Sequence, residues 1–157
     1  MKIRVLFTGK TTDPWIRQGI EVYAGRILHY VSFELVEIPD LRQTASLSEE
    51  QVKLREGELI LKALKPTDHL VLLDERGAAF SSLDWARNLE QKAAHLPKDL
   101  VFVVGGPYGF SVEVQARCQE RLSLSRMTFS HQLVRLVFLE QLYRAFTIIR
   151  GEPYHHE

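Results

Sequence analysis

Two short, almost wholly apolar segments constrain the fold of this chain more than any other feature of its sequence. Residues 69–74 (HLVLLD) and 100–104 (LVFVV) are near-continuous apolar runs, which is the pattern of strands buried on both faces of a parallel sheet. Residues 2–8, 32–38 and, more weakly, 122–126 also predict strands. Helical patterns alternate with these segments. We therefore expect an α/β domain with a mainly parallel sheet and helices on both of its faces.

Helix-start signals mark the segments between the strands. Asp13 followed by Pro14 is an N-cap and a first-turn proline, and Ser48 with Gln51 forms a capping-box pattern. Further start signals are a serine at 81 or 82 and Ser111. The last helix is expected from about 131 to 150. With 157 residues and no linker, repeat or low-complexity tract, the chain predicts a single domain over residues 1–157.

The last predicted helix is unusually apolar. Twelve of the twenty residues 131–150 are apolar, and at about 100° per residue they leave no clean polar face. The sheet of so small a domain can cover only one side of this helix. A partner subunit is the simplest cover for the other side, and we expect a homodimer. The alternative is a central helix that its own chain encloses completely.

Composition excludes several classes of protein. No apolar run approaches the ~20 residues that span a bilayer, so no membrane role is expected, and the first eight residues are typical of a strand rather than of a signal peptide. Cys118 is the only cysteine, which favours a reducing, cytoplasmic setting and rules out a cysteine-based metal site. The formal net charge of zero argues against a general electrostatic binder of nucleic acid.

A glycine-rich loop, Gly105–Gly109 (GGPYG), follows the predicted strand at 100–104. It is not the dinucleotide fingerprint, because Pro107 stands where the second glycine should be, and no Gly-Lys-Ser/Thr follows to make a P-loop. Its bare backbone would let a flat ring or a ribose approach closely at the carboxyl end of a strand. The alternative is a plain turn from strand to helix.

Arginines and histidines gather in the last third of the chain. After Lys98 all six cations are arginines, whose planar donors suit phosphate or a polarised carbonyl, although chance and helix-end electrostatics would explain them equally well. His131 and Arg135 lie on one helix face, whereas Arg144 lies roughly 220° from His131 around the same helix. One helix cannot easily direct His131 and Arg144 into one pocket.

The terminal segment 153–157 (PYHHE) holds side chains that stack on bases and move protons near neutral pH. Its two adjacent histidines make a poor metal site, because no third ligand is indicated, and we expect no metal.

Three segments carry a resemblance to a known family: VVGGPYGFS, LSLSRMTFSHQLVRLVFLEQLYRAF and RGEPYHHE. They resemble the RlmH-type family of large-subunit ribosomal RNA pseudouridine N3-methyltransferases in the SPOUT superfamily, and the similarity extends over essentially the whole chain. The resemblance implies a SPOUT-type α/β domain with a C-terminal trefoil knot, a homodimer, and S-adenosylmethionine as methyl donor. The resemblance also implies that the substrate of the enzyme is a pseudouridine of 23S rRNA in the assembled ribosome. The positions that match the family's cofactor loops are Leu73, Gly105, Leu124, Ser125, Arg126, Met127, Thr128 and Phe129.

A mechanistic hypothesis follows for the tail. The tail of one subunit would close over the site of the other, with His155 as base or proton relay, Tyr154 stacking on or hydrogen-bonding the base, and Arg144 stabilising negative charge. The alternative function is a non-enzymatic, nucleotide-binding α/β dimer that docks on RNA or on the ribosome. A purely structural dimer is a third interpretation, but it leaves the glycine loop unexplained.

Overall fold

The computed structural model describes residues 1–156, so Glu157, the last residue of the predicted tail, lies outside the described part. Strands and helices alternate along the chain, as predicted. Their order is β1 (Lys2–Thr8), α1 (Pro14–Ile27), β2 (Ser32–Ile38), a 3-10 turn η1 (Thr44–Ser46), α2 (Glu49–Lys62), β3 (His69–Ala79), α3 (Ser82–His95), β4 (Leu100–Val104), α4 (Val112–Arg117), β5 (Glu120–Ser123) and α5 (Leu133–Ile149).

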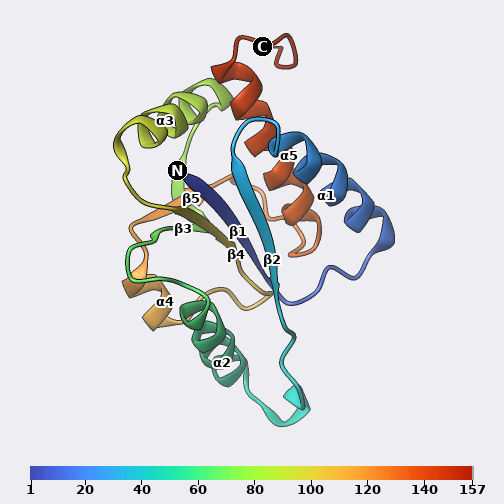
Figure 1. Cartoon of the computed structure of the whole chain (residues 1–157). Coiled ribbons are helices and arrows are strands. Elements are labelled where there is room, and N and C mark those ends of the chain that lie inside the picture. Colours follow the sequence, from blue (N-terminus) through green and yellow to red (C-terminus); the bar gives the residue numbers. More distant parts are fainter. Residues whose placement is uncertain (157) are drawn as a thin grey trace.

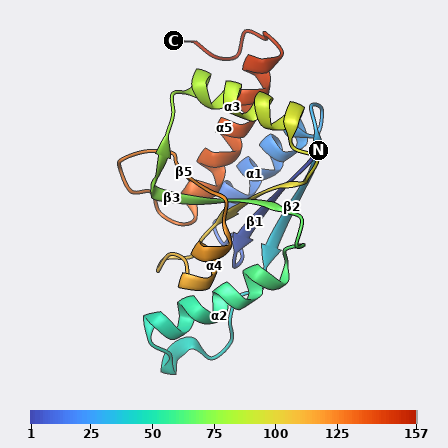
Figure 2. The ribbon, with the colours of Figure 1, turned by 90° about the vertical axis from the view of Figure 1, so that its left-hand side faces the viewer.

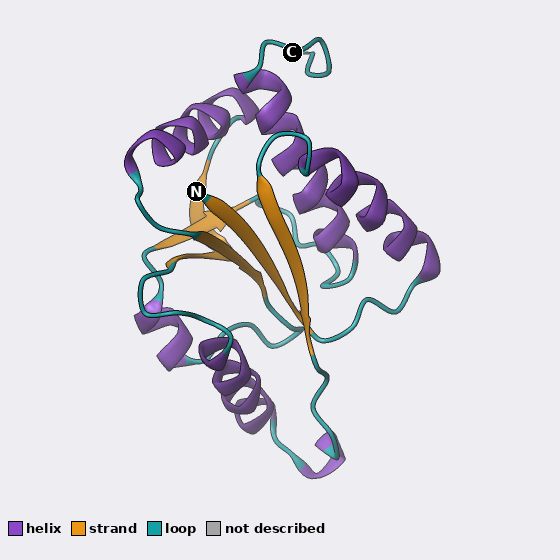
Figure 3. Ribbon diagram, in the orientation of Figure 1, coloured by secondary structure: helices purple, strands orange, loops and turns teal. Residues whose placement is uncertain are grey.

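The five strands form one sheet in the order β2-β1-β4-β3-β5. Every strand pair in it is parallel. Helices α1, α3 and α5 cover one face, and α2 and α4 cover the other (Figures 1 and 2). Figure 3 shows the resulting three layers, helix over strand over helix. The predicted α/β class with helices on both faces is confirmed, whereas the C-terminal trefoil knot stays a prediction.

The alternation of side chains along the central strands divides the core in two. In β4, Phe102 and Val104 pack with the α1, α3 and α5 side, while Val101 and Val103 pack with the α2 and α4 side. All four residues are almost completely excluded from solvent. Both faces of the strand are therefore apolar because both are covered, which explains the unbroken run LVFVV.

Arg135 anchors α5 to the sheet and is the largest fully buried side chain. Its guanidinium donates to the carbonyl oxygens of Gly9 at 2.9 Å and Thr8 at 2.8 Å, and to Oγ1 of Thr11 at 3.0 Å. It also lies over the ring of Phe7, 4.9 Å from the ring centre. Arg135 thus holds main-chain carbonyls at the carboxyl end of β1, and its role is structural.

Strand β3 is longer than the sequence predicts. It was expected to end at Asp74, but it continues to Ala79 and pairs with β5 beyond a register shift between Leu73 and Ala78. Gly77 makes this possible, because a Cβ atom there would lie 2.5 Å from the main chain of Arg121. Because residues 74–76 are charged, the apolar pattern did not predict that the strand continues beyond Asp74.

The fifth strand and the last helix also differ from expectation at their ends. Strand β5 spans Glu120–Ser123 instead of 122–126, because the chain turns at Ser125: the amide of Met127 donates to Oγ of Ser125 at 2.9 Å. Helix α5 spans Leu133–Ile149, two residues shorter at the start than expected. Within residues 1–156, no helix has both the length and the apolar character that crossing a bilayer requires.

Candidate functional site

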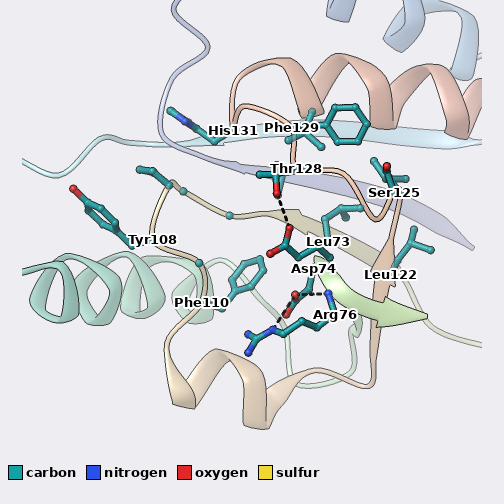
Figure 4. A pocket seen from close by; sticks show the side chains of 18 of the residues that line it. Leu73, Asp74, Arg76, Tyr108, Phe110, Leu122, Ser125, Thr128, Phe129 and His131 are labelled. Carbon is teal, nitrogen blue, oxygen red and sulfur yellow. Dashed lines mark hydrogen bonds and ion pairs between the residues drawn. The ribbon is translucent and has the colours of Figure 1, made fainter. Parts of the chain in front are cut away.

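A cavity of about 590 Å³ opens at the carboxyl ends of β3 and β4. The glycine loop Gly105–Gly109 forms one wall and the segment from Leu124 to His131 forms the other (Figure 4). Ligands of parallel α/β sheets bind at this edge, and the volume is in the range of small-molecule sites.

Seven of the eight residues expected to hold a cofactor line this cavity, and the eighth, Arg126, does not. The seven come from three separate segments of the chain: Leu73, Gly105, Leu124, Ser125, Met127, Thr128 and Phe129. The fold therefore brings together residues up to 56 positions apart, which supports their grouping into one site.

The glycine loop is shaped by close packing and by a left-handed turn. A Cβ atom on Gly105 would lie 3.0 Å from the ring of Phe110, which packs against the loop. Gly109 has φ +81°, and its amide donates to the carbonyl oxygen of Gly106 at 3.2 Å. Glycine at 105 thus lets Phe110 fill the space that a side chain would take, and the loop's main chain faces the cavity.

The opposite wall is tied to the middle of β3 by a side-chain hydrogen bond. The hydroxyl of Thr128 donates to Oε2 of Glu75 at 3.0 Å. Below it, Asp74 accepts a hydrogen bond from the amide of Arg76 at 2.9 Å (Figure 4). The Thr128–Glu75 hydrogen bond holds the 125–129 segment against the middle of β3, and the Asp74–Arg76 contact lies within the strand itself.

His131, just before α5, and Val134, in the first turn of α5, also line the cavity. Burial, followed by the nearby charge of Arg135, lowers the pKa of His131 below its ordinary value. His131 is therefore a neutral imidazole at neutral pH and contributes no positive charge to the cavity.

The three residues expected to be catalytic lie together at the other end of α5. Nη1 of Arg144 lies 3.0 Å from Nδ1 of His155, and its guanidinium lies over the ring of Tyr154 at 4.9 Å. Glu140 joins the group, since one of its oxygens accepts hydrogen bonds from Arg144 and, at 3.1 Å, from the hydroxyl of Tyr154. We call Glu140, Arg144, Tyr154 and His155 the tail cluster.

Aromatic packing holds the tail in place. The rings of Tyr143 and Tyr154 meet edge to face with centres 4.7 Å apart, and the hydroxyl of Tyr30 donates to Glu152 at 2.7 Å. Burial, then the neighbouring Tyr23 and Glu140, raises the pKa of Tyr154 well above its ordinary value. Tyr154 therefore stays protonated at neutral pH and can donate a hydrogen bond but not accept a proton.

The cavity and the tail cluster lie at opposite ends of one helix. Helix α5 has 17 residues, which corresponds to about 25 Å at 1.5 Å per residue. Within residues 1–156, no member of the tail cluster lines the cavity. One copy of the chain therefore cannot bring both groups to one reacting atom, in keeping with the angular separation of His131 and Arg144 in the sequence.

Comparison with known proteins decides the family. A family model described as "Predicted SPOUT methyltransferase" matches residues 1–155. The chain belongs to the SPOUT methyltransferase family. It is a methyltransferase on this ground.

Relatives of this SPOUT chain match it from end to end. It is 54% identical over 157 residues to a protein of Parabacteroides distasonis named "Ribosomal RNA large subunit methyltransferase H", with all of both chains covered. A protein of the same name from Porphyromonas gingivalis is 53% identical, again over the full length of both. Among solved structures, a probable methylase family protein from Haemophilus influenzae has a TM-score of 0.52 at 16% identity. That match covers 95% of this chain and 66% of the other, and it shows the fold alone.

Sequence reasoning missed two acidic parts of the SPOUT site. Asp74 and Glu75 line the cavity, although their segment was identified only as the end of a strand. Glu140 was not identified as a site residue, and nothing in the spacing indicated that Tyr154 would return to it. Within the described residues, no group of histidine, cysteine or carboxylate side chains is placed to hold a metal ion.

One face of the SPOUT domain leaves apolar side chains uncovered. Trp15 and Val22 on α1 are 59% and 49% exposed. Beside them, α1 and α5 approach closely, since a Cβ atom on Gly19 would lie 2.8 Å from Leu136. Leu133, Leu136 and Val137 of α5 are only half-buried. We call this the α1/α5 face, and Val134 connects it to the cavity.

Proposed function

We propose that this protein transfers a methyl group from S-adenosylmethionine to N3 of a pseudouridine in 23S rRNA. The observation that carries the proposal is the convergence of seven predicted cofactor residues on one cavity at the carboxyl edge of the sheet. The names of the relatives support large-subunit ribosomal RNA as the substrate.

The lining of the cavity suits a nucleoside with an amino-acid end. Leu73, Leu124 and Phe129 offer apolar surface for a base, while the main chain of the glycine loop offers amide donors. When bound, S-adenosylmethionine supplies a methyl group already activated by its sulfonium. The residues of the chain have to position the acceptor nitrogen in line with that methyl and exclude water.

The tail cluster suits the acceptor base. The imide nitrogen of pseudouridine carries a proton and becomes nucleophilic only when that proton leaves. Arg144 would stabilise the negative charge that develops on the ring, and His155 would accept or relay the proton. Tyr154 stays protonated, so it would stack on the base or donate a hydrogen bond to it.

A two-fold dimer would join the two half-sites. If two copies pack antiparallel through the α1/α5 face, the end of α5 in one copy lies near the start of α5 in its partner. The tail cluster of one subunit would then face the cavity of the other. The exposed Trp15 and Val22 and the half-buried side of α5 support this packing.

Cofactor binding is tested first by calorimetric titration of S-adenosylmethionine. Thr128→Trp fills the exposed rim of the cavity, and Val112→Trp places the same ring on an exposed position outside it. We expect binding to the wild type and to Val112→Trp and loss of binding in Thr128→Trp. Equal binding by all three proteins would contradict the assignment of the cavity.

The shared site is tested by mixing two inactive variants. Thr128→Trp would lose the cavity, and a double variant Tyr154→Phe, His155→Ala would lose the tail. In randomly mixed dimers of the two, the composite arrangement restores about a quarter of the wild-type sites, because half the dimers are mixed and each has one intact pair. If each site is built within one chain, the mixture will recover no activity. If the tail variants alone methylate at the normal rate, the proposed role of the tail is wrong.

The substrate is tested with labelled methyl donor on ribosomal particles that lack the modification. We expect the label on one pseudouridine of the large-subunit RNA, found by mass spectrometry. Since the net charge is zero, we expect the protein to recognise a shaped ribosomal surface and to methylate protein-free RNA poorly. This substrate would place the protein in the cytoplasm. Cofactor binding without transfer to any particle would instead favour the non-enzymatic binding module.

A further inference from the structure

Glu56 of α2 lies directly behind the glycine loop. A Cβ atom on Gly106 would lie 2.8 Å from Oε2 and 3.0 Å from Oε1 of Glu56, so the carboxyl group fills the place of the missing side chain. Gly106 lines the cavity with its main chain. Only the backbone of one glycine therefore stands between the carboxyl group and the cavity.

The position of Glu56 is fixed by the packing of its helix. The next residue, Gly57, is buried against α4, where a Cβ atom would lie 2.3 Å from Oγ of Ser111. Ser111 is itself buried and caps α4 by accepting from the amide of Val114 at 3.3 Å. The backbone at Glu56 therefore cannot move away from the loop without separating α2 from α4.

Glu56 is half-buried, and one of its two carboxyl oxygens lacks a hydrogen-bond partner in the described part of the chain. Oε1 of Glu56 is buried and has no hydrogen-bond partner within residues 1–156. Burial, and then the like charge of Asp40, raises the pKa of the group above its ordinary value. A carboxylate in this setting destabilises the fold unless something positive comes near it.

We infer that Glu56 is the counter-charge for the methyl donor, and that it makes the cavity favour the cationic sulfonium over the uncharged thioether product. The inference rests on the proposed function, because it takes the ligand to be S-adenosylmethionine. The argument for this role is charge complementarity. The methyl donor has one positive charge more than the product, and the carboxyl group of Glu56 has no cation beside it in the described residues. Glu56 acts across Gly106 and is a positioning residue, not a catalytic one.

The other carboxylates near the cavity are less suited to this role. Asp74 is already engaged by Arg76, at 2.9 Å from its amide. Glu75 lies on an exposed part of the rim and accepts from Thr128, so solvent and salt screen its charge. The half-buried carboxylate of Glu56 interacts more strongly at the same distance than the exposed one of Glu75, because the local dielectric is lower.

The inference predicts a specific pattern of ligand affinities. Glu56→Gln keeps the shape of the side chain and removes its charge, and Glu58→Gln makes the same change at an exposed position two residues along α2. The probes are S-adenosylmethionine, S-adenosylhomocysteine, which lacks the sulfonium charge, and sinefungin, which carries an ammonium in its place. We expect Glu56→Gln to weaken both cationic ligands about tenfold and the thioether by less than about twofold.

Each outcome has one meaning. A wild type that binds none of the three ligands refutes the proposed function and not the placement of Glu56. An equal loss for all three ligands in Glu56→Gln shows that the residue does not distinguish the sulfonium from the thioether, since all three share the same amino-acid end, and it overturns the inference. Unchanged affinities in Glu56→Gln, or the selective loss appearing in Glu75→Gln instead, also overturns it. Glu58→Gln should match the wild type throughout.

Discussion

Nη1 of Arg144 lies 3.0 Å from Nδ1 of His155. A guanidinium has only donors, so Nδ1 is the acceptor, and a neutral His155 ring carries its proton on Nε2. Under the proposed mechanism, His155 can accept a proton at Nδ1 only when Arg144 turns to another acceptor. The developing negative charge on the substrate base is such an acceptor, so binding of the base and release of the imidazole would occur together.

The first prediction concerns Glu140, which accepts hydrogen bonds from both Arg144 and Tyr154. Glu140→Gln should loosen the tail and slow methyl transfer on the order of tenfold, because small misplacements of catalytic groups reduce rates steeply. The affinity for S-adenosylmethionine should not change, since Glu140 contacts the tail and is not among the residues that line the cavity. Measured rates and affinities separate the two effects, and a variant whose affinity falls with its rate would show that the cluster and the cavity are not independent.

The second prediction concerns the α1/α5 face. Val22→Asp should give a monomer that remains folded, because Val22 is 49% exposed in the single chain. Light scattering measures the mass of the variant, and circular dichroism shows whether it is folded. A methyl-transfer assay measures the expected loss of activity. Leu54→Asp places the same charge on α2, at a position 45% exposed on the other side of the sheet, and should stay dimeric and active. A dimeric, active Val22→Asp protein would argue for a different interface.

The third prediction concerns Arg135. Arg135→Met leaves the carbonyl oxygens of Thr8 and Gly9 buried without their donor, at a cost of about 3 kcal/mol in the free energy of unfolding. For a chain of this size the melting temperature should fall by about 6–12 °C. The exposed Arg87, paired with Asp84 at 3.1 Å, is the control, and Arg87→Met should change stability by less than about 1 kcal/mol. If the two variants have the same melting temperature, the buried hydrogen bonds of Arg135 do not anchor α5.

The fourth prediction concerns the pH dependence of stability at Glu56. Its pKa is raised in the folded state, so the folded chain holds this proton more tightly than the unfolded chain. The stability that the group contributes is present below its ordinary pKa and is lost as the pH rises through the raised value. Glu56→Gln should therefore melt about 2 °C above the wild type near neutral pH. The difference should shrink toward about pH 4, where the wild-type group is protonated. A difference that instead grows on acidification would contradict the raised pKa.

The sheet was predictable because its central strands are short, apolar and buried on both faces. Leu100–Val104 and the start of β3 at His69 were expected at the observed positions. The extension of β3 past Asp74 was not, because its pairing depends on the absence of a side chain at Gly77. A single glycine in a charged segment gives no signal of this kind in sequence.

The residues assigned to the cavity and to the tail lie together in the structure, but the acidic residues beside them were not identified from the sequence. Leu73, Gly105 and Thr128 were assigned by resemblance, and the structure brings them together. Glu140 and Glu56 instead act through contacts with residues 14 and 50 positions away. Such contacts come from tertiary packing, and neither helical periodicity nor a local motif encodes them.

Helix α5 carries a wall of the cavity at its start and the tail cluster at its end, so its length is part of the site. One inserted residue would rotate the tail by about 100° and shift it by about 1.5 Å relative to His131. Under the proposed two-fold packing the error would appear twice, once in each subunit. Evolution can therefore exchange many side chains along this helix, but it has little freedom to insert or delete one.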